Sequence, residues 1–371
     1  MELKNLKTGT NRFINNSKTL EVLIPTYNRP EKVVQTIKSC LAIKDPRLSV
    51  RCNSNGFEPS LEKLRNLDKR LVYDCFETNQ GILANMLFLL NMSNARYAML
   101  LSDEDKLNEN GSKKILDFLD KLPDVVSVIS CSIFDEEANS YYFLTRTSDS
   151  YNFNLNEYML LGMPAPSYIS GLIFSTKALR EINLERLYSY SVGNAYPHLD
   201  VLIRLLEQGS LRFYNNNFVI KGVELDFGGE GYEHRSTPRG LASDNLDLNP
   251  LVYGPKGRAR QFYYQDQVIT NAKNVNEFSR MIAKLYNFIA FYKAIKNSGN
   301  VTILKKGCDI RQEVFIAKHE SIVHYEWSGS IFSRAFIPFI KLPWSIGMLN
   351  CRIFTFILRV YNKFLWKSYS K

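Results

Sequence analysis

Strand-like apolar runs alternate with helical segments through the first third of the chain, and this alternation restricts the fold more than any other feature. The four runs are residues 20–25, 48–52, 70–76 and 97–101. Apolar residues at helical spacing follow the first run, and another helix is expected over residues 82–92. Such alternation builds a largely parallel sheet whose ligand pockets open at the carboxyl ends of the strands. The sequence therefore predicts an α/β domain.

The fourth run ends in an acidic segment, Ser102-Asp103-Glu104-Asp105. Three carboxylates at the exposed end of a buried strand repel one another unless a cation lies among them. Mg²⁺ and Mn²⁺ take oxygen ligands and keep positions open for phosphates, so the pattern indicates a metal-diphosphate site. The alternative is an acidic turn that caps the next helix.

Polar segments follow three of the predicted strands, at residues 25–29, 53–56 and 103–105. The carboxyl ends of parallel strands lie at one edge of a sheet, so we expect these segments to meet in one crevice. Pro30 directly follows the first segment and suits the first position of a helix.

Three motifs, in this order and spacing, carry a resemblance to a known family: Ile24-Pro-Thr-Tyr-Asn-Arg29, Asn79-Gln-Gly81 and Ser102-Asp-Glu-Asp105. On these residues the chain resembles family 2 glycosyltransferases, the inverting, nucleotide-sugar-dependent type, of the bacterial surface-polysaccharide kind. The resemblance covers residues 20–222. It implies a GT-A fold, with a Rossmann-like, mostly parallel sheet flanked by helices and a mainly helical C-terminal extension.

The resemblance also implies a site for a nucleotide diphosphate sugar at these motifs. Pro25 and Tyr27 would border the base, with Thr26 between them, and Arg29 would meet a phosphate or the edge of the ribose. The alternative is a rigid turn with a solvated arginine.

The resemblance defines the nucleobase of the donor less well. Family members usually end the second strand with an Asp that contacts the base, whereas this chain has Asn53. An amide both donates and accepts hydrogen bonds, so a UDP-sugar is favoured and another base stays open. Asn79 and Gly81, at the third strand end, either shape the loop or touch the ligand.

In the acidic segment, residues two apart point the same way, so Asp103 and Asp105 differ in direction from Glu104. The family pattern turns Asp103 toward the ribose and counts Glu104 among the residues at the nucleotide sugar. It gives Asp105, together with Asp103, to Mn²⁺ or Mg²⁺ on the diphosphate. The cation would neutralise the charge that builds on the departing diphosphate.

An inverting transfer needs a base that takes the proton of the acceptor hydroxyl, and a predicted helix at residues 196–209 offers two candidates. Asp200 is favoured, because family members carry Glu-Asp near this helix start and the pair here is Leu199-Asp200. His198 is the rival, since its unperturbed pKa lies near neutrality. Both can also be ordinary first-turn residues, Asp being favoured there by the helix dipole.

The region before that helix is expected on the acceptor side. Aromatic residues at 141–143 and 151–158 either stack on sugar rings or belong to the core. A loop before a strand that ends at Phe174 contains Ser170 and Gly171, which the resemblance places near the donor sugar and acceptor.

The sequence suggests five parts: a polar lead at 1–19, a GT-A catalytic domain at 20–225, a flexible loop or lid at 226–260, a helical extension at 261–329 and a basic aromatic amphipathic tail at 330–371. The loop is rich in Gly, Pro, Asp and Asn. Its His234 and Arg235 either reach the diphosphate or are solvated.

The last 42 residues hold seven Lys or Arg and no Asp or Glu, and so supply +7 of the formal net charge of +10. This composition is typical of helices in a membrane interface, although a helical pair packed on the domain also fits. Basic residues interrupt the tail too regularly for a spanning helix. With a polar N-terminus and no signal peptide, we expect a cytoplasmic protein, peripheral at the inner face of the plasma membrane, with a saccharide or lipid-linked saccharide acceptor.

Other function classes fit these features less well. A nucleotidyltransferase would show a basic Gly-rich loop after its first strand, which residues 25–29 do not form. The pI of 9.1 suits a nucleic-acid-binding protein, but the positive charge lies in the tail and the crevice motifs are acidic, so no nucleic-acid partner is expected. A non-catalytic scaffold that binds nucleotide sugar stays open. The six cysteines lack Cys-x-x-Cys spacing, which favours reduced core thiols.

Overall fold

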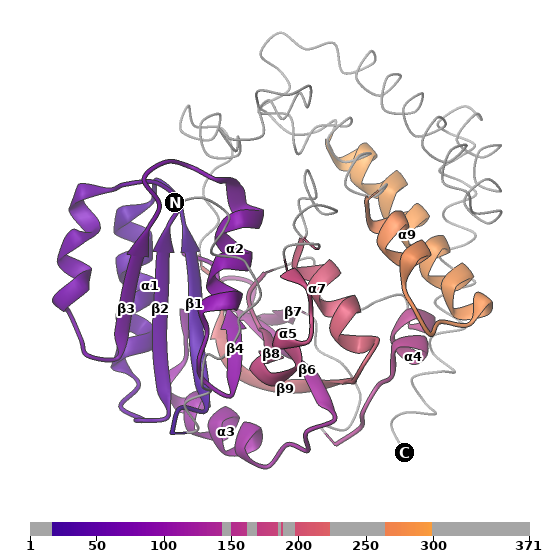
Figure 1. Cartoon of the computed structure of the whole chain (residues 1–371), viewed down its shortest axis with the longest axis horizontal. Coiled ribbons are helices and arrows are strands. Elements are labelled where there is room, and N and C mark those ends of the chain that lie inside the picture. Colours follow the sequence, from indigo (N-terminus) through magenta and orange to yellow (C-terminus); the bar gives the residue numbers. More distant parts are fainter. Residues whose placement is uncertain are drawn as a thin grey trace, which may run out of the picture.

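The computed structural model describes residues 17–142, 150–161, 169–184, 187, 197–222 and 264–298. These residues form a central sheet with helices on both faces (Figure 1). The arrangement is the α/β architecture that the alternation of strands and helices predicts.

One half of the sheet is parallel. Its strands, in spatial order, are β3 (Leu71–Cys75), β2 (Leu48–Ser54), β1 (Leu20–Thr26) and β4 (Tyr97–Leu100). β2 pairs in parallel with β3 and with β1, and β1 pairs in parallel with β4. The segments that follow these four strands therefore begin at one edge of the sheet.

The other half of the sheet is mixed, which differs from the expectation of a mostly parallel sheet. β8 (Leu172–Ser175) is antiparallel to β4 and to β6 (Val126–Asp135), and β6 is parallel to β9 (Ser210–Ile220). Two short strands, β5 (Lys106–Leu107) and β7 (Ser140–Tyr142), run antiparallel to β9 and β6. Only residues 136–139 connect β6 to β7, which is too short for the crossover that parallel strands need.

Helices cover both faces of the sheet and divide its apolar side chains into two cores. The first face carries α1 (Pro30–Ala42), the 3-10 helix η2 (Pro59–Asn66) and α3 (Glu109–Asp120). The second face carries α2 (Gly81–Met92), α4 (Leu155–Leu160), α5 (Thr176–Arg180) and α7 (Pro197–Leu206).

The local sequence explains how β1 and α1 form. Leu20, Val22 and Ile24 join the first core while Leu23 joins the second, which is the two-residue period of a strand buried on both faces. α1 begins at Pro30, because the first helical position needs no amide hydrogen. The buried residues of α1 recur at helical spacing: Val33, Thr36, Ile37, Cys40 and Leu41.

A helical extension follows the sheet, as expected for part of residues 261–329. It consists of a helical segment at 264–271 and of α9 (Glu277–Ser298), which packs on α4. The buried Lys284 of α9 joins the two pieces, because its Nζ lies 3.2 Å from Asp266 Oδ2 and donates to Thr270 Oγ1 at 2.7 Å.

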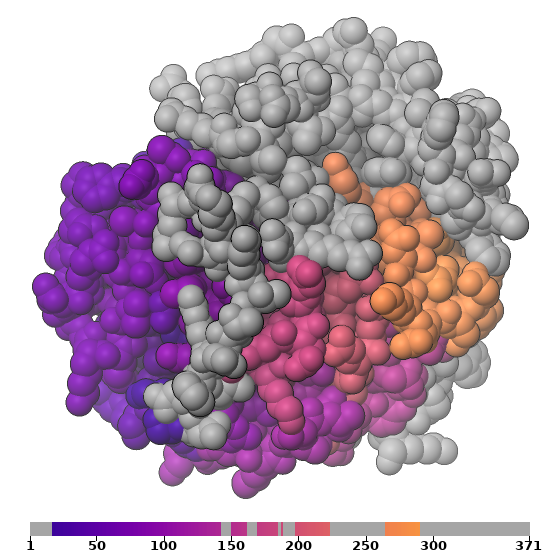
Figure 2. Space-filling model, in the orientation of Figure 1, coloured from indigo at the N-terminus to yellow at the C-terminus, as the bar shows by residue number. Residues whose placement is uncertain are grey.

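The extension also contacts the end of α7. Arg204 Nη1 donates to the carbonyl oxygen of Asn271 at 3.4 Å, and the Lys273 amide donates to Glu207 Oε1 at 2.7 Å. Figure 2 shows the two regions next to each other on the surface. In the described part of the chain, no helix combines the length and the apolar character that crossing a bilayer requires. The proposed lid, with His234 and Arg235, and the basic tail lie outside the described residues.

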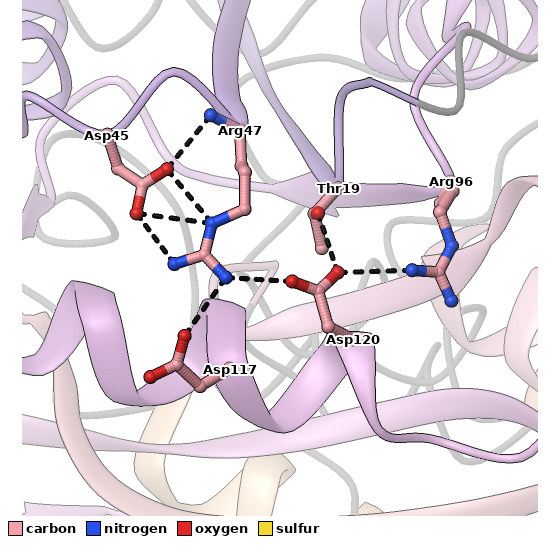
Figure 3. Close-up of polar contacts among 6 residues, drawn as sticks. All are labelled: Thr19, Asp45, Arg47, Arg96, Asp117 and Asp120. Atoms are coloured by element: carbon pink, nitrogen blue, oxygen red, sulfur yellow. Dashed lines mark hydrogen bonds and ion pairs between the residues drawn. The ribbon is translucent and has the colours of Figure 1, made fainter.

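A network of ion pairs lies at the amino ends of β1, β2 and β4 (Figure 3). We call it the edge network, and its members are Thr19, Asp45, Arg47, Arg96, Asp117 and Asp120. Arg47 Nη1 lies 2.9 Å from Asp117 Oδ1 and 2.7 Å from Asp120 Oδ2, and both partners belong to α3. The edge network therefore fastens α3 to the strand starts.

The described cysteines are free thiols, as the sequence predicts. Cys40, Cys52 and Cys131 are buried, and Cys75 is half-buried. Burial raises the pKa of Cys40 to about 12, so this thiol stays protonated and unreactive at neutral pH.

Candidate active site

The segment after β1 and the acidic segment after β4 meet through Asp103. Thr26 Oγ1 donates to Asp103 Oδ2 at 2.7 Å, and Arg29 Nη1 donates to Asp103 Oδ1 at 3.0 Å. Thr36 Oγ1, from α1, donates to the backbone oxygen of Asp103 at 3.0 Å. Asp103 is thus held from three sides, with 5% of its surface exposed. The structure brings these two segments together, as the sequence predicts.

A side chain of the protein supplies one cation at the acidic segment. Arg29 Nη1 lies 3.0 Å from Asp103 Oδ1 and 3.0 Å from Glu104 Oε2. Arg29 was expected at a phosphate or ribose, and Glu104 was expected to point away from its neighbour. In this structure both belong to one group, which we call the site cluster: Thr26, Arg29, Asp103, Glu104 and Asp105.

Burial leaves the site cluster short of positive charge. Desolvation raises the pKa of Asp103 above its usual range, and this outweighs the opposing effect of Arg29. Desolvation also raises the pKa of Glu104, with repulsion from Asp103 and Asp105 added and with Arg29 again opposing. A further cation at this edge would favour the ionised forms. Perturbed carboxyl groups of this kind gather at functional sites more often than elsewhere.

Asp105 is held differently from its two neighbours. Its side chain is fully buried, where Oδ2 accepts a hydrogen bond from Ser170 Oγ and Oδ1 accepts one from the Gly222 amide at 2.8 Å. Ser170 directly precedes the β8 region and Gly222 follows β9. Asp105 therefore joins the acidic segment to the mixed half of the sheet, a contact that the sequence reading did not include.

Asn53 is buried inside the protein and does not lie at the exposed end of β2. Its side chain is fully buried, and Nδ2 donates to Asn85 Oδ1 of α2 at 2.8 Å. Asn85 Nδ2 donates in turn to the backbone oxygen of Asn53 at 3.1 Å. β2 extends past the predicted end at Cys52 to Ser54, which places Asn53 within the strand. A base contact by Asn53 stays a prediction, and in this structure Asn53 contacts α2.

Asn55 takes the strand-end position that was expected for Asn53. Its Nδ2 donates to Asn79 Oδ1 at 2.7 Å, and its Oδ1 accepts from the Gln80 amide at 2.8 Å. Asn79 Oδ1 also accepts from the Gly81 amide at 2.8 Å. Gly81 has a φ of +88°, in the region that favours glycine. Asn79 and Gly81 therefore shape this loop, one of the two roles that the sequence left open.

Tyr27 lies across the end of β2. A Cβ atom built on Gly56 would be 3.5 Å from Cε2 of the Tyr27 ring, so the ring rests on this glycine. Asn28 adopts a φ of +54°, which Asn tolerates better than most residues, and turns the chain between Tyr27 and Arg29. Pro25 lies within β1, opposite Asn53 in the register. The half-buried ring of Tyr27 is therefore the residue of this segment best placed to stack on a base.

Asp200 and His198 both lie in the first turn of α7 and are buried. Arg204 Nε lies 3.7 Å from Asp200 Oδ1, one helical turn later. Arg204 also lies 2.8 Å from Glu207 Oε1. The described part of this predicted helix begins at Pro197, and the choice between Asp200 and His198 as the base stays a prediction.

The acidic segment fits a divalent cation as a site with few protein ligands. Within the described ranges, no group of three or more His, Cys, Asp or Glu side chains is arranged to hold an ion. In nucleotide sites such ions use one or two carboxylates and take further ligands from phosphates and water. Each oxygen of a carboxylate has two lone pairs, so Asp105 can be such a ligand while Asp103 and Glu104 stay with Arg29.

A family comparison now identifies the class of this domain. Residues 21–182 match the family model described as Glycosyl transferase family 2. These residues therefore form a glycosyltransferase domain similar to that family. No curated protein gives a significant match.

Solved structures of S. aureus TarS 1-349 share the fold. The first has a TM-score of 0.58 at 12% identity, covering 91% of this chain and 90% of that chain. TarS 1-349 in complex with UDP-GlcNAc gives 0.58 at 14% identity, with 91% and 90% covered. The UDP complex gives 0.50 at 14% identity, with 87% and 90% covered. The likeness supports the GT-A fold that the sequence motifs imply.

Several residues around the site cluster escaped the sequence reading. Thr36, Asn55, Asn85 and Gly222 each make a hydrogen bond within this region. Thr36 is a polar residue on the buried face of α1, and Asn85 is a buried polar residue in the largely apolar helix α2. A polar residue at a position expected to be buried could have indicated these contacts, because buried polar groups need hydrogen-bond partners.

Proposed function

We propose that the protein is an inverting glycosyltransferase. It moves a sugar from a nucleotide diphosphate sugar to a hydroxyl of a glycan or of a lipid-linked saccharide, in bacterial surface polysaccharide assembly. The observation that carries the proposal is the site cluster, because a family 2 domain here places an Arg and buried carboxylates together at the carboxyl ends of β1 and β4.

The donor favoured is a UDP-sugar. TarS structures contain UDP-GlcNAc and UDP, and their fold is similar to that of this chain. In this chain the Tyr27 ring lies beside Gly56 and offers a stacking surface, and Asn55, the residue before Gly56, carries a side-chain amide. Amides both donate and accept, which suits the mixed donor and acceptor edge of uracil.

Asp105, with Asp103 beside it, would hold Mn²⁺ or Mg²⁺ together with the diphosphate oxygens. Such a cation, when bound, stabilises the negative charge that develops on the leaving diphosphate. Arg29 contributes positive charge to the same edge and donates a hydrogen bond to Asp103, which would face the ribose. Coordination at Asp105 requires that the hydrogen bond from Ser170 or from Gly222 be shared with the ion.

Asp200 would take the proton of the acceptor hydroxyl as that oxygen attacks the anomeric carbon, and His198 is the alternative base. Both lie at the start of α7, and a base acts only within hydrogen-bond reach of the hydroxyl. The buried position of Asp200 would limit exchange with bulk water, which is the competing acceptor.

We also propose that the protein is cytoplasmic and lies on the inner face of the plasma membrane through residues 330–371. The charge of +7 in this tail and its aromatic residues support the proposal. The earlier division into lead, catalytic domain, lid, extension and tail is part of the same proposal.

A thermal-shift screen of the full chain tests the donor. UDP-, GDP- and dTDP-sugars are each added with and without MnCl₂, and release of nucleotide diphosphate is followed in parallel. A donor at 100 times its dissociation constant stabilises the folded state by about 2.7 kcal/mol, so a clear rise in Tm is expected with one UDP-sugar and Mn²⁺. No shift with any nucleotide sugar would contradict the proposal, and a shift without any turnover would favour the non-catalytic scaffold.

A further inference from the structure

The hydroxyl of Ser170 lies at the junction between the acidic segment and β8. Ser170 Oγ accepts a hydrogen bond from the Ser102 amide at 2.8 Å and donates one to Asp105 Oδ2. The Ser170 side chain has no exposed surface, and neither has Asp105. One buried hydroxyl thus contacts both ends of the segment that contains the predicted metal ligand.

The direction of the Ser170 hydroxyl follows from its partners. A hydroxyl has one proton to donate, and an amide can only donate to it. The amide of Ser102 therefore occupies a lone pair of Ser170, and the single proton points to Asp105. This arrangement fixes the rotamer of the Asp105 carboxylate through Oδ2, while Oδ1 faces the Gly222 amide.

The backbone next to Ser170 is tied to β6 by close contacts of Gly171. Gly171 has a φ of +85°, and a Cβ atom added there would lie 3.2 Å from the carbonyl oxygen of Cys131. The Cys131 amide donates to the carbonyl oxygen of Gly171 at 2.9 Å. Ser170 is therefore anchored to β6 at the point where the chain enters β8, between β6 and β4.

We propose that Ser170 is a positioning residue for Asp105, which sets the orientation of this carboxylate toward a divalent cation. The inference rests on the proposed function, in which Asp105 holds the cation of the donor. Hydrogen bonds to a ligating carboxylate typically affect metal affinity by 10- to 100-fold, because they orient the ligand and tune its basicity. The resemblance to the family places Ser170 near the donor sugar and acceptor, whereas this geometry places its hydroxyl on Asp105, the proposed metal ligand.

The test compares Ser170→Ala with Ser130→Ala in the full chain. Ser130 is a suitable control because it is buried in β6, pairs in register with Leu172 of β8, and its hydroxyl has no hydrogen-bond partner among the described residues. Isothermal titration measures the affinity for UDP with and without MnCl₂, and the half-saturating Mn²⁺ concentration. Circular dichroism and thermal melting report folding.

The expected result is a rise of about 10- to 100-fold in the half-saturating Mn²⁺ concentration for Ser170→Ala, with UDP affinity in EDTA within about twofold of wild type. Ser130→Ala keeps the wild-type Mn²⁺ response. If Ser170→Ala is recovered unfolded, Ser170→Cys replaces it in the Mn²⁺ titration. The thiol is similar in size to the hydroxyl but is only a weak hydrogen-bond donor.

Two outcomes would overturn the inference, and they differ in what else they affect. An unchanged Mn²⁺ response in the Ser170 variant, with a wild type that requires Mn²⁺ for UDP binding, removes the role of Ser170 and leaves the proposed function intact. A wild type whose UDP binding is indifferent to Mn²⁺ removes the metal from the proposed function and the inference with it.

Discussion

The site cluster and the edge network both place Arg beside carboxylates, the first at the carboxyl ends and the second at the amino ends of the parallel strands. The pKa shifts of the carboxylates have opposite directions in the two places. In the edge network, a hydrogen bond from Arg47 lowers the pKa of Asp45, and water reaches the partners, Asp117 being 44% exposed. In the site cluster, burial raises the pKa of Asp103 although Arg29 contacts it. The same pairing of Arg with carboxylates therefore favours the ionised form of Asp45 in the edge network. In the site cluster it does not offset the burial of Asp103.

The difference teaches what separates a structural ion pair from a binding site. The edge network has two Arg side chains for three carboxylates and lies partly in solvent. Its ion pairs therefore stabilise the folded state modestly, and its carboxylates need no further cation. In the site cluster, the contacts to Arg29 serve two of three carboxylates. Of these, Asp103 and Asp105 are buried and Glu104 is half-buried. We expect substitutions at the first edge to change stability alone, and those at the second to change binding and turnover as well as stability.

The largest effect is expected for Asp200→Asn. Loss of the base lowers kcat by about 10²- to 10⁴-fold, while UDP affinity is retained because the proposed role of Asp200, on α7, is toward the acceptor hydroxyl and not toward the nucleotide. Rates of UDP release and calorimetric UDP binding check both parts. Asp117→Asn, in the edge network, is the control and keeps kcat within about twofold. If Asp200→Asn turns over normally and His198→Gln does not, the base is His198.

A smaller loss is expected for Asp105→Asn. The amide is a poorer ligand for a hard cation than a carboxylate, so the Mn²⁺-dependent part of UDP affinity falls by about 10- to 100-fold. Titration of UDP at fixed Mn²⁺ measures this. The matched change in the edge network, Asp120→Asn, is expected to leave nucleotide affinity unchanged and to lower Tm. Equal nucleotide affinities for both variants would break the comparison between the two edges.

The two arginines give a third contrast, in stability. Arg29→Ala leaves Asp103 buried without its cationic partner and costs roughly 1–3 kcal/mol of unfolding free energy, since hydrogen bonds to charged groups are the stronger kind. Arg47→Ala costs about 1 kcal/mol, because its pairs are partly exposed. Urea denaturation of both variants, at constant m-value, provides the comparison. A larger loss for Arg47→Ala would contradict the role given to burial.

The smallest effect is a pH-dependent one at Glu104. Its pKa is raised in the folded protein, so below the usual value of 4.5 the side chain is protonated in both states and costs nothing. As pH rises through the folded pKa, the ionised carboxylate destabilises the folded state relative to Glu104→Gln. The variant should therefore match wild type at pH 4 and melt about 2 °C higher at pH 7.5.

Asp45→Asn provides the opposite sign. The pKa of Asp45 is lowered in the folded protein, so its stabilising effect is present above the unfolded pKa and is lost as pH falls. This variant should melt below wild type at pH 7.5 and approach it in acid. Melting curves of the same sign for both variants would show that the two edges do not differ as described.

Local sequence was sufficient to predict the parallel half of the sheet. The runs that become β1 to β4 are recognised from their strand-like apolar residues, and Pro30 marks the start of α1. The mixed half was not predictable, since β8 and β6 are apolar runs whose direction depends on connections and not on their own residues. The sequence also left the order β3-β2-β1-β4-β8-β6-β9-β5 unspecified, because pairing is a property of distant segments.

For the candidate site, the convergence of the motif segments was predictable and the partners were not. Strand ends meet because parallel strands align, which brings Thr26 to Asp103 across 77 positions of sequence. Which hydrogen bond each carboxylate makes depends on side-chain directions set by packing. β2 is two residues longer than predicted and ends at Ser54. The residue just after the strand, expected to face the nucleobase, is therefore Asn55 and not Asn53. Ser170 became visible as a partner of Asp105 only once β8 was placed.

Arg204 carries a consequence beyond α7. Its guanidinium reaches Asp200 at 3.7 Å and also the backbone of Asn271, which precedes α9. The candidate proton acceptor and the start of the helical extension thus share one side chain. A shift of the extension would therefore act on the first turn of α7 through Arg204, so a segment outside the sheet can influence the position of the proposed base.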